Sequence, residues 1–537
     1  MDTEVLIVGA GPVGLTLAYD LGRRGVRCIL IERNDAPQFL PKMERCNARS
    51  MEIFRRLALA EKIRAAGLRS DVPMDVFIIL AMNEPPLVSQ HYPSVDEARA
   101  AIRACNDGTL PLEPYQLISQ YTLEPLLKAE CEALPSVSVR YGCEFVSFEQ
   151  DATGVSAQVR GGRAVETIRA AYMVGCDGGA SAVRKQLGIA LRGEGNLLEL
   201  HQALFRCDAL FDRIPIGEGP GHGRHYHVAD ERATFLIMQD STRHWTLHAV
   251  VDRPEDMKTL FERTVAIPVH YEMLSCAPWR MNLLLADSYG AGRVFLAGDA
   301  VHLVVPTGGL GMNTGVGDAV DLSWKLAATL QGWGGPNLLR SYEFERRQVG
   351  ERNVGASRYA ALGRRKWRAQ YRPEIRDATP AGAAARTHLT AVAKAEQPKS
   401  NEMIGAELGY RYMDSPIVAN IPGGPEHSFR DYRPTTWPGA RLPHVWLEDG
   451  TPIQDRIPDG YTILRLGGSA PDTRGLERSL RSFGALVSAL DIPDAAARDL
   501  YEHDIILLRP DMHIVWRGNR VPDDVRDIAA TATGHLA

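Results

Sequence analysis

The chain has 537 residues, of which 45% are hydrophobic and 24% are charged, and its formal net charge is -5. This length predicts two or three domains, because one hydrophobic core rarely serves so long a chain. The slightly acidic balance gives no reason to expect a nucleic-acid partner. No apolar run reaches the roughly 18 residues that a membrane span needs, and the N-terminus lacks the features of a signal peptide.

The eight cysteines lie between Cys28 and Cys276, and no two of them form a Cys-x-x-Cys pair. This spacing argues against a zinc site, a redox-active dithiol and a secreted disulfide framework. It fits a reducing compartment, so we expect a cytoplasmic protein without a metal site. The cysteines are expected to be small buried apolar residues.

The N-terminal segment has the pattern of a strand, a helix and a second strand. Residues 5–8 and 28–31 are continuous apolar runs, and residues 15–18 open a helix between them. The first glycine of the intervening Gly-x-Gly-x-x-Gly allows a sharp turn, the second lets amides approach a pyrophosphate, and the third permits close helix packing. The expected nucleotide-binding residues are Gly9, Gly11, Pro12, Val13 and Gly14.

Glu32 ends the second strand, where an acid accepts hydrogen bonds from a ribose diol. Arg33 follows it and is also expected to contact the cofactor. An acid at this position favours an adenosine without a 2′-phosphate, which suits FAD or NAD better than NADP. The motif by itself leaves FAD and NAD both open.

A later strand at residues 294–297 ends in Gly298-Asp299. A carboxylate there can accept hydrogen bonds from ribityl hydroxyls, which a flavin has and NAD lacks. The glycine-rich run after this strand predicts a turn into an apolar helix from residue 316, with backbone amides aimed at a flavin pyrimidine ring. The expected flavin-binding residues are Asp299, Pro306, Gly309, Gly311, Met312 and Asn313.

Together these motifs resemble those of the single-component FAD-dependent aromatic hydroxylases, the group A flavoprotein monooxygenases that include phenol hydroxylase and para-hydroxybenzoate hydroxylase. The resemblance covers the first glycine motif, Asp177-Gly178, Gly298-Asp299 and the stretches 306–315 and 321–326. It implies that the Asp177-Gly178 motif, and with it Arg184, contacts both FAD and the passing nicotinamide. It also implies that Gln120 bonds the FAD.

The same resemblance implies FAD as cofactor and NADPH or NADH as co-substrate. The expected reaction is hydroxylation of a phenolic aromatic ring by O2 through a flavin C4a-hydroperoxide, on a substituted phenol, a catechol or an aromatic polyketide. A Baeyer–Villiger or epoxidising monooxygenase stays open, as does a non-catalytic nucleotide-binding protein. A flavin dehydrogenase or disulfide reductase would need a second nucleotide-binding unit or a dithiol. We expect a monomer or homodimer whose partners are a small aromatic substrate and O2.

Residues 41–52 resemble the family segment that passes the isoalloxazine ring, so Lys42 and Arg45 are expected at the cofactor. Glu44 falls where the phenol hydroxylase branch has a substrate-facing acid, and we expect it to accept or deprotonate the phenol. The alternative is a surface carboxylate paired with Lys42 or Arg45. His222, His225, Tyr226 and His227 have poor spacing for zinc. The expected catalytic residues are Glu44, Arg45, Tyr226, His227 and Pro306.

The predicted fold class is α/β, with a Rossmann-like FAD-binding domain interleaved with a mainly antiparallel β substrate domain. The FAD-binding domain is expected at 1–75, 100–185 and 281–360, and the substrate domain at 76–99 and 186–280. A helical linker at 361–400 leads to a domain at 401–537, which resembles the thioredoxin-like tail of the phenol hydroxylase branch. Its expected strands are 440–447, 461–466, 505–511 and 513–518. Because no cysteine follows Cys276, thiol redox chemistry is excluded there and a packing or dimer role is expected.

Overall fold

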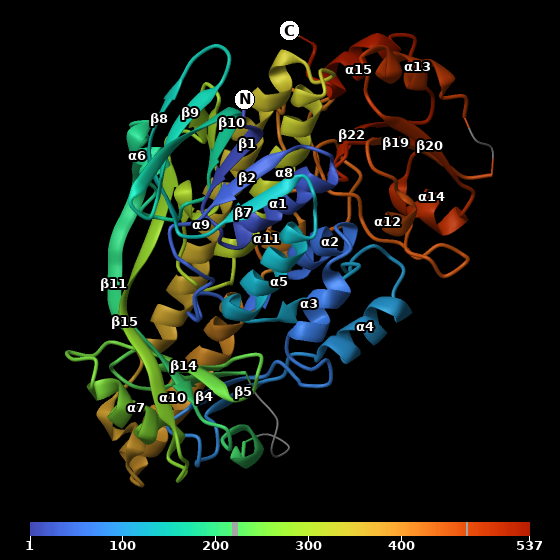
Figure 1. The fold of residues 1–537 in the computed structure, drawn as a ribbon. Coiled ribbons are helices and arrows are strands. Elements are labelled where there is room, and N and C mark those ends of the chain that lie inside the picture. The colour runs from blue at the N-terminus through green and yellow to red at the C-terminus, as the bar shows by residue number, and fades with distance from the viewer. Residues whose placement is uncertain (217–223, 469–470, 537) are drawn as a thin grey trace.

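Residues 1–216, 224–468 and 471–536 are described by the computed structural model, and they form three larger β-sheets (Figure 1). The strands of the first sheet are β1 (Thr3–Val8), β2 (Cys28–Ile31), β7 (Val137–Arg140), β8 (Cys143–Gln150), β9 (Val155–Gly161), β10 (Ala164–Gly175), β16 (Gly290–Ala291) and β17 (Val294–Leu296). Its centre is parallel, with β1 between β2 and β10, β7 beyond β2 and β17 beyond β10. The remaining strands pair antiparallel at its edges.

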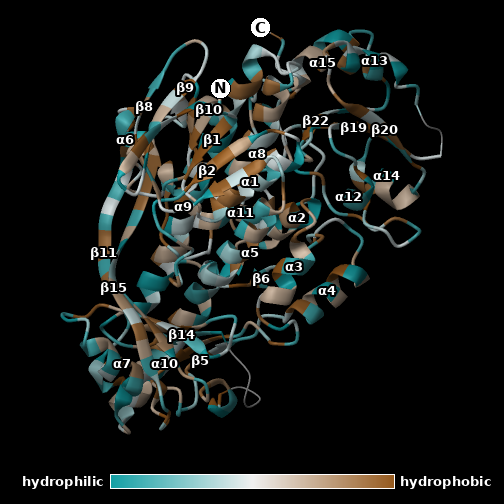
Figure 2. Ribbon diagram, in the orientation of Figure 1, coloured by the Kyte–Doolittle hydropathy of each residue, from teal (hydrophilic) through white to brown (hydrophobic). Residues whose placement is uncertain are grey.

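Of the helices in this part of the chain, α1 (Pro12–Arg23), α5 (Gln120–Glu132) and α6 (Ala182–Gln186) contact the first sheet. Further helices are α2 (Ala48–Arg56), α3 (Ala60–Ala66), α4 (Val95–Ala104), α8 (Gly311–Leu330) and α9 (Pro336–Arg368). α1 packs against α5 and α8. Val5, Leu6 and Ile7 of β1 are fully buried, and Figure 2 shows the central strands in the brown of hydrophobic residues. The predicted strand–helix–strand unit is confirmed.

The second sheet contains the long strands that run down one side of the molecule in Figure 1. Its order is β18 (His302–Leu303), β15 (Glu272–Ala286), β11 (Leu191–Arg206), β14 (His244–Ala249), β13 (Phe235–Met238), β12 (His225–Val228), β4 (Val76–Ile79) and β5 (Val88–Gln90). All pairs are antiparallel except β12 with β4. The expected antiparallel sheet is therefore present, and the segment near residue 80 joins it. A short ribbon of β3 (Arg45–Cys46) and β6 (Gln116–Leu117) lies apart from it.

The two faces of the second sheet differ in chemistry because strand side chains alternate in direction. Tyr226, Leu236 and Leu247 belong to the hydrophobic core that also contains residues of α7 (Asp256–Val265). His227 pairs across the strands with Phe235, and Phe235 stacks on His248 at 4.4 Å between ring centroids. The face that carries these histidines is called the histidine face below.

The C-terminal segment forms a four-stranded sheet of its own, drawn in red in Figure 1. The strand order is β20 (Val487–Ile492), β19 (Tyr461–Leu466), β21 (Ile505–Leu508) and β22 (Ile514–Gly518), and the helices near it are α12 (Ile453–Arg456), α13 (Arg474–Ser482), α14 (Ala495–Tyr501) and α15 (Val525–Ala532). β19 and β20 are parallel, and the other two pairs are antiparallel. Three of the expected strands are thus confirmed.

Two expectations for the C-terminal third are wrong. Residues 440–447 form no strand but only isolated bridges, such as Arg441 with His513, and Pro443 within this stretch lacks the N–H that a ladder needs. The boundary expected at residue 360 falls inside α9, which continues to Arg368. Residues 361–400 are otherwise helical, as expected, with α10 (Pro380–Glu396) after α9 and then α11 (Ile404–Leu408).

A fully buried ion network joins the C-terminal segment to α8 and α9. Arg509 donates to Glu345 at 2.6 Å, to Asp321 at 2.8 Å and to Asp511 at 2.5 Å. Lys325 donates to Asp321 at 2.7 Å and to Glu345 at 2.6 Å. Burial raises the pKa of Asp321 to about 7 against the opposing charges of Lys325 and Arg509. These contacts place the Arg-Pro-Asp motif of the C-terminal segment directly on α8.

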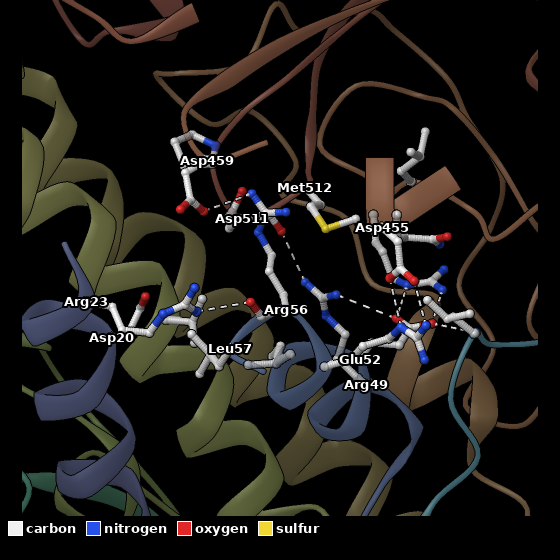
Figure 3. A pocket seen from close by; sticks show the side chains of 18 of the residues that line it. Asp20, Arg23, Arg49, Glu52, Arg56, Leu57, Asp455, Asp459, Asp511 and Met512 are labelled. Carbon is white, nitrogen blue, oxygen red and sulfur yellow. Dashed lines mark hydrogen bonds and ion pairs between the residues drawn. The ribbon is translucent and has the colours of Figure 1, made fainter. Parts of the chain in front are cut away.

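Figure 3 shows a cavity of about 40 Å³ beside this interface. Arg49 donates to the backbone oxygen of Asp511, and Arg56 donates to backbone oxygens near Asp459. Glu52 binds Arg441 through two hydrogen bonds. A cavity of this size holds about one or two water molecules. Because its lining side chains are also bonded to one another, we interpret it as a gap at the domain junction and not as a substrate site. Among the described residues, no helix combines the length and apolar character needed to cross a membrane.

Candidate functional site

The first glycine turn lies against the Asp177-Gly178 loop. Gly9 has φ +105°, and a Cβ there would lie 2.5 Å from the backbone oxygen of Cys176. A Cβ on Gly14 would lie 2.0 Å from the oxygen of Gly9. Both positions therefore need glycine for reasons internal to the protein.

Gly11 differs, because no protein atom requires a glycine there. Its φ of -73° is open to any residue, and the nearest atom to a Cβ is Glu124 Oε1 at 4.0 Å. Gly11 is also the N-cap of α1, where the first N–H groups lack helical partners. Open space beside unpaired amides at a helix N-terminus fits the close approach of a pyrophosphate. Pro12 is the first residue of this helix, and Val13 follows it.

Glu32 contacts the first glycine turn. Its Oε2 accepts from the Ala10 N–H at 3.0 Å, and its Oε1 accepts from the Asn34 side chain at 2.6 Å. Arg33 next to it is exposed. Gln120 at the start of α5 donates to Glu124 at 2.5 Å, beside the space at Gly11. Glu32 and Gln120 thus both lie near the first glycine turn.

The Asp177-Gly178 loop is held by a cap that the sequence did not predict. Asp177 accepts from the Ser181 hydroxyl at 2.5 Å and from the Ala182 N–H at 2.7 Å, which caps α6. Arg184 donates to the backbone oxygen of Ala300 at 3.0 Å and so joins this loop to the Gly298-Asp299 motif. Gly178 has φ +79° and open space around it. The structure therefore gives Asp177 and Arg184 positioning contacts within the protein.

Asp299 has an open carboxylate deep in the molecule. Its side chain is accessible, yet burial raises its pKa, against the opposing charges of His302 and Lys42. No hydrogen bond to this carboxylate is found within the described part of the chain. Gly298 has φ +64°, and a Cβ on it would lie 3.0 Å from Val13. An unengaged acceptor beside the first glycine turn fits the ribityl hydroxyls of a flavin.

A buried ion network beneath Gly298 was missed by sequence reasoning. Asp318 of α8 accepts from the Gly298 N–H at 3.1 Å, from His302 Nε2 at 2.8 Å and from Arg346 Nε at 2.8 Å. Burial opposes ionisation, but the Arg346 and His302 contacts outweigh it and lower the pKa of Asp318. The sequence did not predict that Asp318 holds the Gly298 turn, because this role depends on Arg346 of α9, which is distant in sequence.

The turn after Pro306 is clamped by two predicted residues. Gly308 and Gly309 have φ +97° and +65°, and the Pro306 oxygen accepts from the Gly309 N–H at 2.9 Å. Arg45 donates to the Gly308 oxygen at 2.7 Å, while its Nε is buried with no partner among the described residues. Asn313 donates to the Gly309 oxygen at 2.7 Å. These contacts join the segment around Arg45 to this turn, although Pro306 itself is exposed.

The helix after this turn begins five residues earlier than the apolar pattern suggested. α8 starts at Gly311, with Met312 in its first turn, rather than at residue 316. A Cβ on Gly315 would lie 2.5 Å from Val13 and 3.0 Å from the Cα of Gly298. Gly315 is therefore a packing glycine inside the helix, and it lets α8 contact both other turns.

Glu44 is not paired with Lys42 or Arg45. Its Oε1 lies 3.0 Å from Arg224 Nη2 and 3.5 Å from His225 Nε2. Burial opposes ionisation of Glu44, but the His225 contact and the charges of Arg224 and Arg45 outweigh it and hold its pKa well below the usual range. Burial and the charge of Arg224 lower the pKa of His225 to about 3. Glu44 is therefore ionised beside a neutral histidine at physiological pH.

Of the two candidates Tyr226 and His227, only one can lie on the side of Glu44, because neighbouring strand residues point to opposite faces. Tyr226 is fully buried in the core, 5.7 Å from the ring of Phe77. His227 lies on the histidine face with His225. Its two ring nitrogens have no partner among the described residues. His222 lies outside the described residues.

Two family models match the chain. One is described as "FAD binding domain" and covers residues 2–357, and the other as "Aromatic-ring hydroxylase, C-terminal" and covers residues 435–535. The first match spans all three motifs that the structure brings together.

Individual proteins agree with these models over the whole chain. An FAD-dependent monooxygenase of Emericella nidulans, apdD, is 32% identical over 99% of this chain and 90% of its own length. A putative polyketide hydroxylase of Streptomyces halstedii is 30% identical over 96% of this chain and 93% of its own length. The crystal structure of a ternary complex of aklavinone-11 hydroxylase with FAD and aklavinone has a TM-score of 0.84 at 28% identity, and covers 99% of both chains.

Replacement of Gly11 by Ala is expected to weaken FAD binding while the apoprotein still folds. The new methyl group would occupy the space beside Gly11, where the nearest protein atom, Glu124 Oε1, lies 4.0 Å away, and loss of charge-assisted amide contacts costs about tenfold or more in affinity. Fluorescence titration of apoprotein with FAD measures the change, and urea unfolding should shift by no more than about 1 kcal/mol. Gly14→Ala is the control, because its Cβ would clash with Gly9 and destabilise the apoprotein itself. An FAD affinity unchanged by Gly11→Ala would contradict the assignment.

His248 should make the protein less stable in acid. Burial lowers the pKa of His248 to about 3. At a pH between this value and the ordinary histidine pKa, the unfolded chain therefore binds a proton at this residue and the folded chain does not. The stability is complete above pH of about 6.5 and is lost as pH falls towards the folded pKa. His248→Phe removes this dependence, so its advantage over wild type should grow by about 1.4 kcal/mol per pH unit between pH of about 6 and 4. Urea unfolding across this range measures it, with exposed His270→Gln as control; parallel curves for wild type and His248→Phe would refute it.

Proposed function

This chain belongs to the FAD-dependent aromatic-ring hydroxylases, and from that premise we propose that it uses NAD(P)H and O2 to hydroxylate a phenolic substrate held against the histidine face. The enzyme is an FAD-dependent monooxygenase, as the sequence predicted.

The observation that carries the proposal is the contact between the histidine face and residues 41–45. Gln202 of β11 donates to the backbone oxygen of Pro41 at 2.6 Å. Glu44 contacts Arg224 and His225 at the start of β12. The segment that also clamps the turn after Pro306 through Arg45 is thus fixed against the sheet. This arrangement supports a substrate site between the sheet and the flavin-binding motifs.

FAD, when bound, supplies the activated oxygen, and the protein must bind the ring and control its hydroxyl proton. An ionised Glu44 is a strong acceptor for a phenol O–H. Its low pKa makes it a poor match for a general base at neutral pH. We therefore propose that Glu44 orients the phenol by accepting its hydrogen bond, with Arg224 fixing the carboxylate.

The larger phenolic substrates of the predicted set fit the comparisons better than simple phenols. The relative from Streptomyces halstedii carries the name putative polyketide hydroxylase, and the similar crystal structure contains aklavinone beside FAD. We propose an aromatic polyketide or a compound of similar ring size as the substrate class for this chain.

For the C-terminal segment we propose a thioredoxin-like fold with a packing role. The order β20-β19-β21-β22, with one parallel and two antiparallel pairs and helices between, supports the fold. The ion network of Arg509 with Asp321 and Glu345 supports the role, because it attaches the segment to the helices that hold the flavin-binding turns.

The function is tested by NADPH and NADH oxidation with a panel of phenols and polycyclic phenols. We expect substrate-stimulated O2 uptake and a product heavier by one oxygen atom. Peroxide release without a heavier product would mean that the panel uncouples the enzyme. No stimulation and no oxygenated product from any hydroxylated aromatic ring would overturn the proposal.

Glu44→Gln is expected to lower kcat/KM about 10- to 100-fold, because an amide accepts a weaker hydrogen bond than a carboxylate. The FAD content and the rate of flavin reduction by NAD(P)H should stay near wild type. Glu199→Gln, an exposed carboxylate on β11, is the control. Unchanged hydroxylation with an unchanged pH profile would remove Glu44 from the mechanism.

A further inference from the structure

One arginine on α9 faces the histidine face without an acidic partner. The guanidinium carbon of Arg364 lies 5.3 Å from the ring centroid of Phe235. Its Nε is buried and lacks a hydrogen-bond partner, and no ion pair to the guanidinium is found within the described residues. Burial, together with the charge of Arg368, outweighs the opposing charge of Glu44 and lowers the pKa of Arg364 to about 9. Its environment therefore disfavours the charge it carries at neutral pH.

The two neighbouring arginines are compensated. Arg224 binds Glu44 at 3.0 Å. Arg368, one turn further along α9, donates to the backbone oxygen of Thr234 at 2.9 Å and lies 3.9 Å from Asp230. Both arginines are thus held by contacts within the protein, and Arg364 is the exception among these three.

The histidines of this face add no charge to it. Burial lowers the pKa of His225 and His248 to about 3, and that of His227 well below its ordinary value. All three are therefore neutral at physiological pH. Among Arg224, Arg364 and Arg368, Arg364 is the one for which the described residues supply neither an ion pair nor a hydrogen bond.

Arg364 is half-buried and its Nε is buried, and a guanidinium partly removed from water without an anion is unfavourable. The contact with Phe235 is a cation–π interaction and offsets only part of that cost, because it leaves the N–H groups of the guanidinium unbonded. An anion that arrived with the substrate would satisfy them. A carboxylate has the planar, two-oxygen shape that the guanidinium fork binds best.

We propose that Arg364 binds a carboxylate on the aromatic substrate, so that the enzyme selects acidic aromatic compounds over their neutral counterparts. This inference rests on the proposed placement of the substrate at the histidine face. In this arrangement Glu44 accepts a hydrogen bond from the phenol hydroxyl, and Arg364 binds the carboxylate of the same substrate.

The test uses the FAD-loaded full-length enzyme and a matched pair of probes, anthraquinone-2-carboxylate and anthraquinone-2-carboxamide. Binding is followed by the change in flavin absorbance, which needs no turnover. Wild type should bind the carboxylate about tenfold or more tightly than the amide. Arg364→Gln should abolish this preference, and Arg364→Lys should retain part of it because it keeps the charge without the fork.

Arg365→Gln is the matched control, because Arg365 is the next residue of α9 and is exposed. It should leave the preference unchanged. Equal affinity of wild type for the two probes, no binding of the carboxylate, or a preference that survives Arg364→Gln would each overturn the inference. Acid selectivity through Arg364 without oxygenated product in the phenol panel would instead count against the proposed reaction alone.

Discussion

Three backbone turns of this protein meet only because glycines at their contacts have no side chain. Gly9 touches the loop at Cys176, and Gly315 touches both Val13 and Gly298 at distances that no Cβ could occupy. The flavin-binding motifs are far apart in sequence, so this contact is what makes them one site. Asp318 then holds the Gly298 turn from below through its N–H. Any change that separates these turns would disrupt every flavin contact at once.

Buried ion pairs also fix the position of α8, the helix that contains Gly315. α8 carries Asp318 towards Gly298 and Asp321 towards Arg509 of the C-terminal segment. Removing one member of such a buried set leaves its partners uncompensated, which typically costs about 3–5 kcal/mol. The C-terminal segment thus fixes α8 from one side while the glycine contacts fix it from the other. A segment without cysteines can in this way affect the flavin site through position alone.

Much of the site could be predicted from sequence because its constraints are local. A Gly-x-Gly-x-x-Gly between a strand and a helix, or an acid at a strand end, fixes the backbone within a few residues, and Gly9 and Gly14 lie in such a tight turn. Contacts between distant segments were not predictable. Nothing near Asp318 in sequence indicates Arg346, and nothing near Glu44 indicates Arg224. The glycines at the start of α8 were interpreted as part of a turn. Their role in packing could not be predicted, because it depends on Val13, which lies about 300 residues away in the sequence.

The histidine face shows how burial separates residues that the sequence presents as a group. His225, Tyr226 and His227 are consecutive, yet alternation sends Tyr226 into the core and leaves the histidines on the side of Glu44. Burial then keeps those histidines neutral, so they can shape a site without adding charge to it. Glu44, Arg224, Arg364 and the neighbouring Arg45 carry the charge on this side. Because Arg224 pairs with Glu44, we expect Arg364 to contribute to the preference of this face for a ligand's charge.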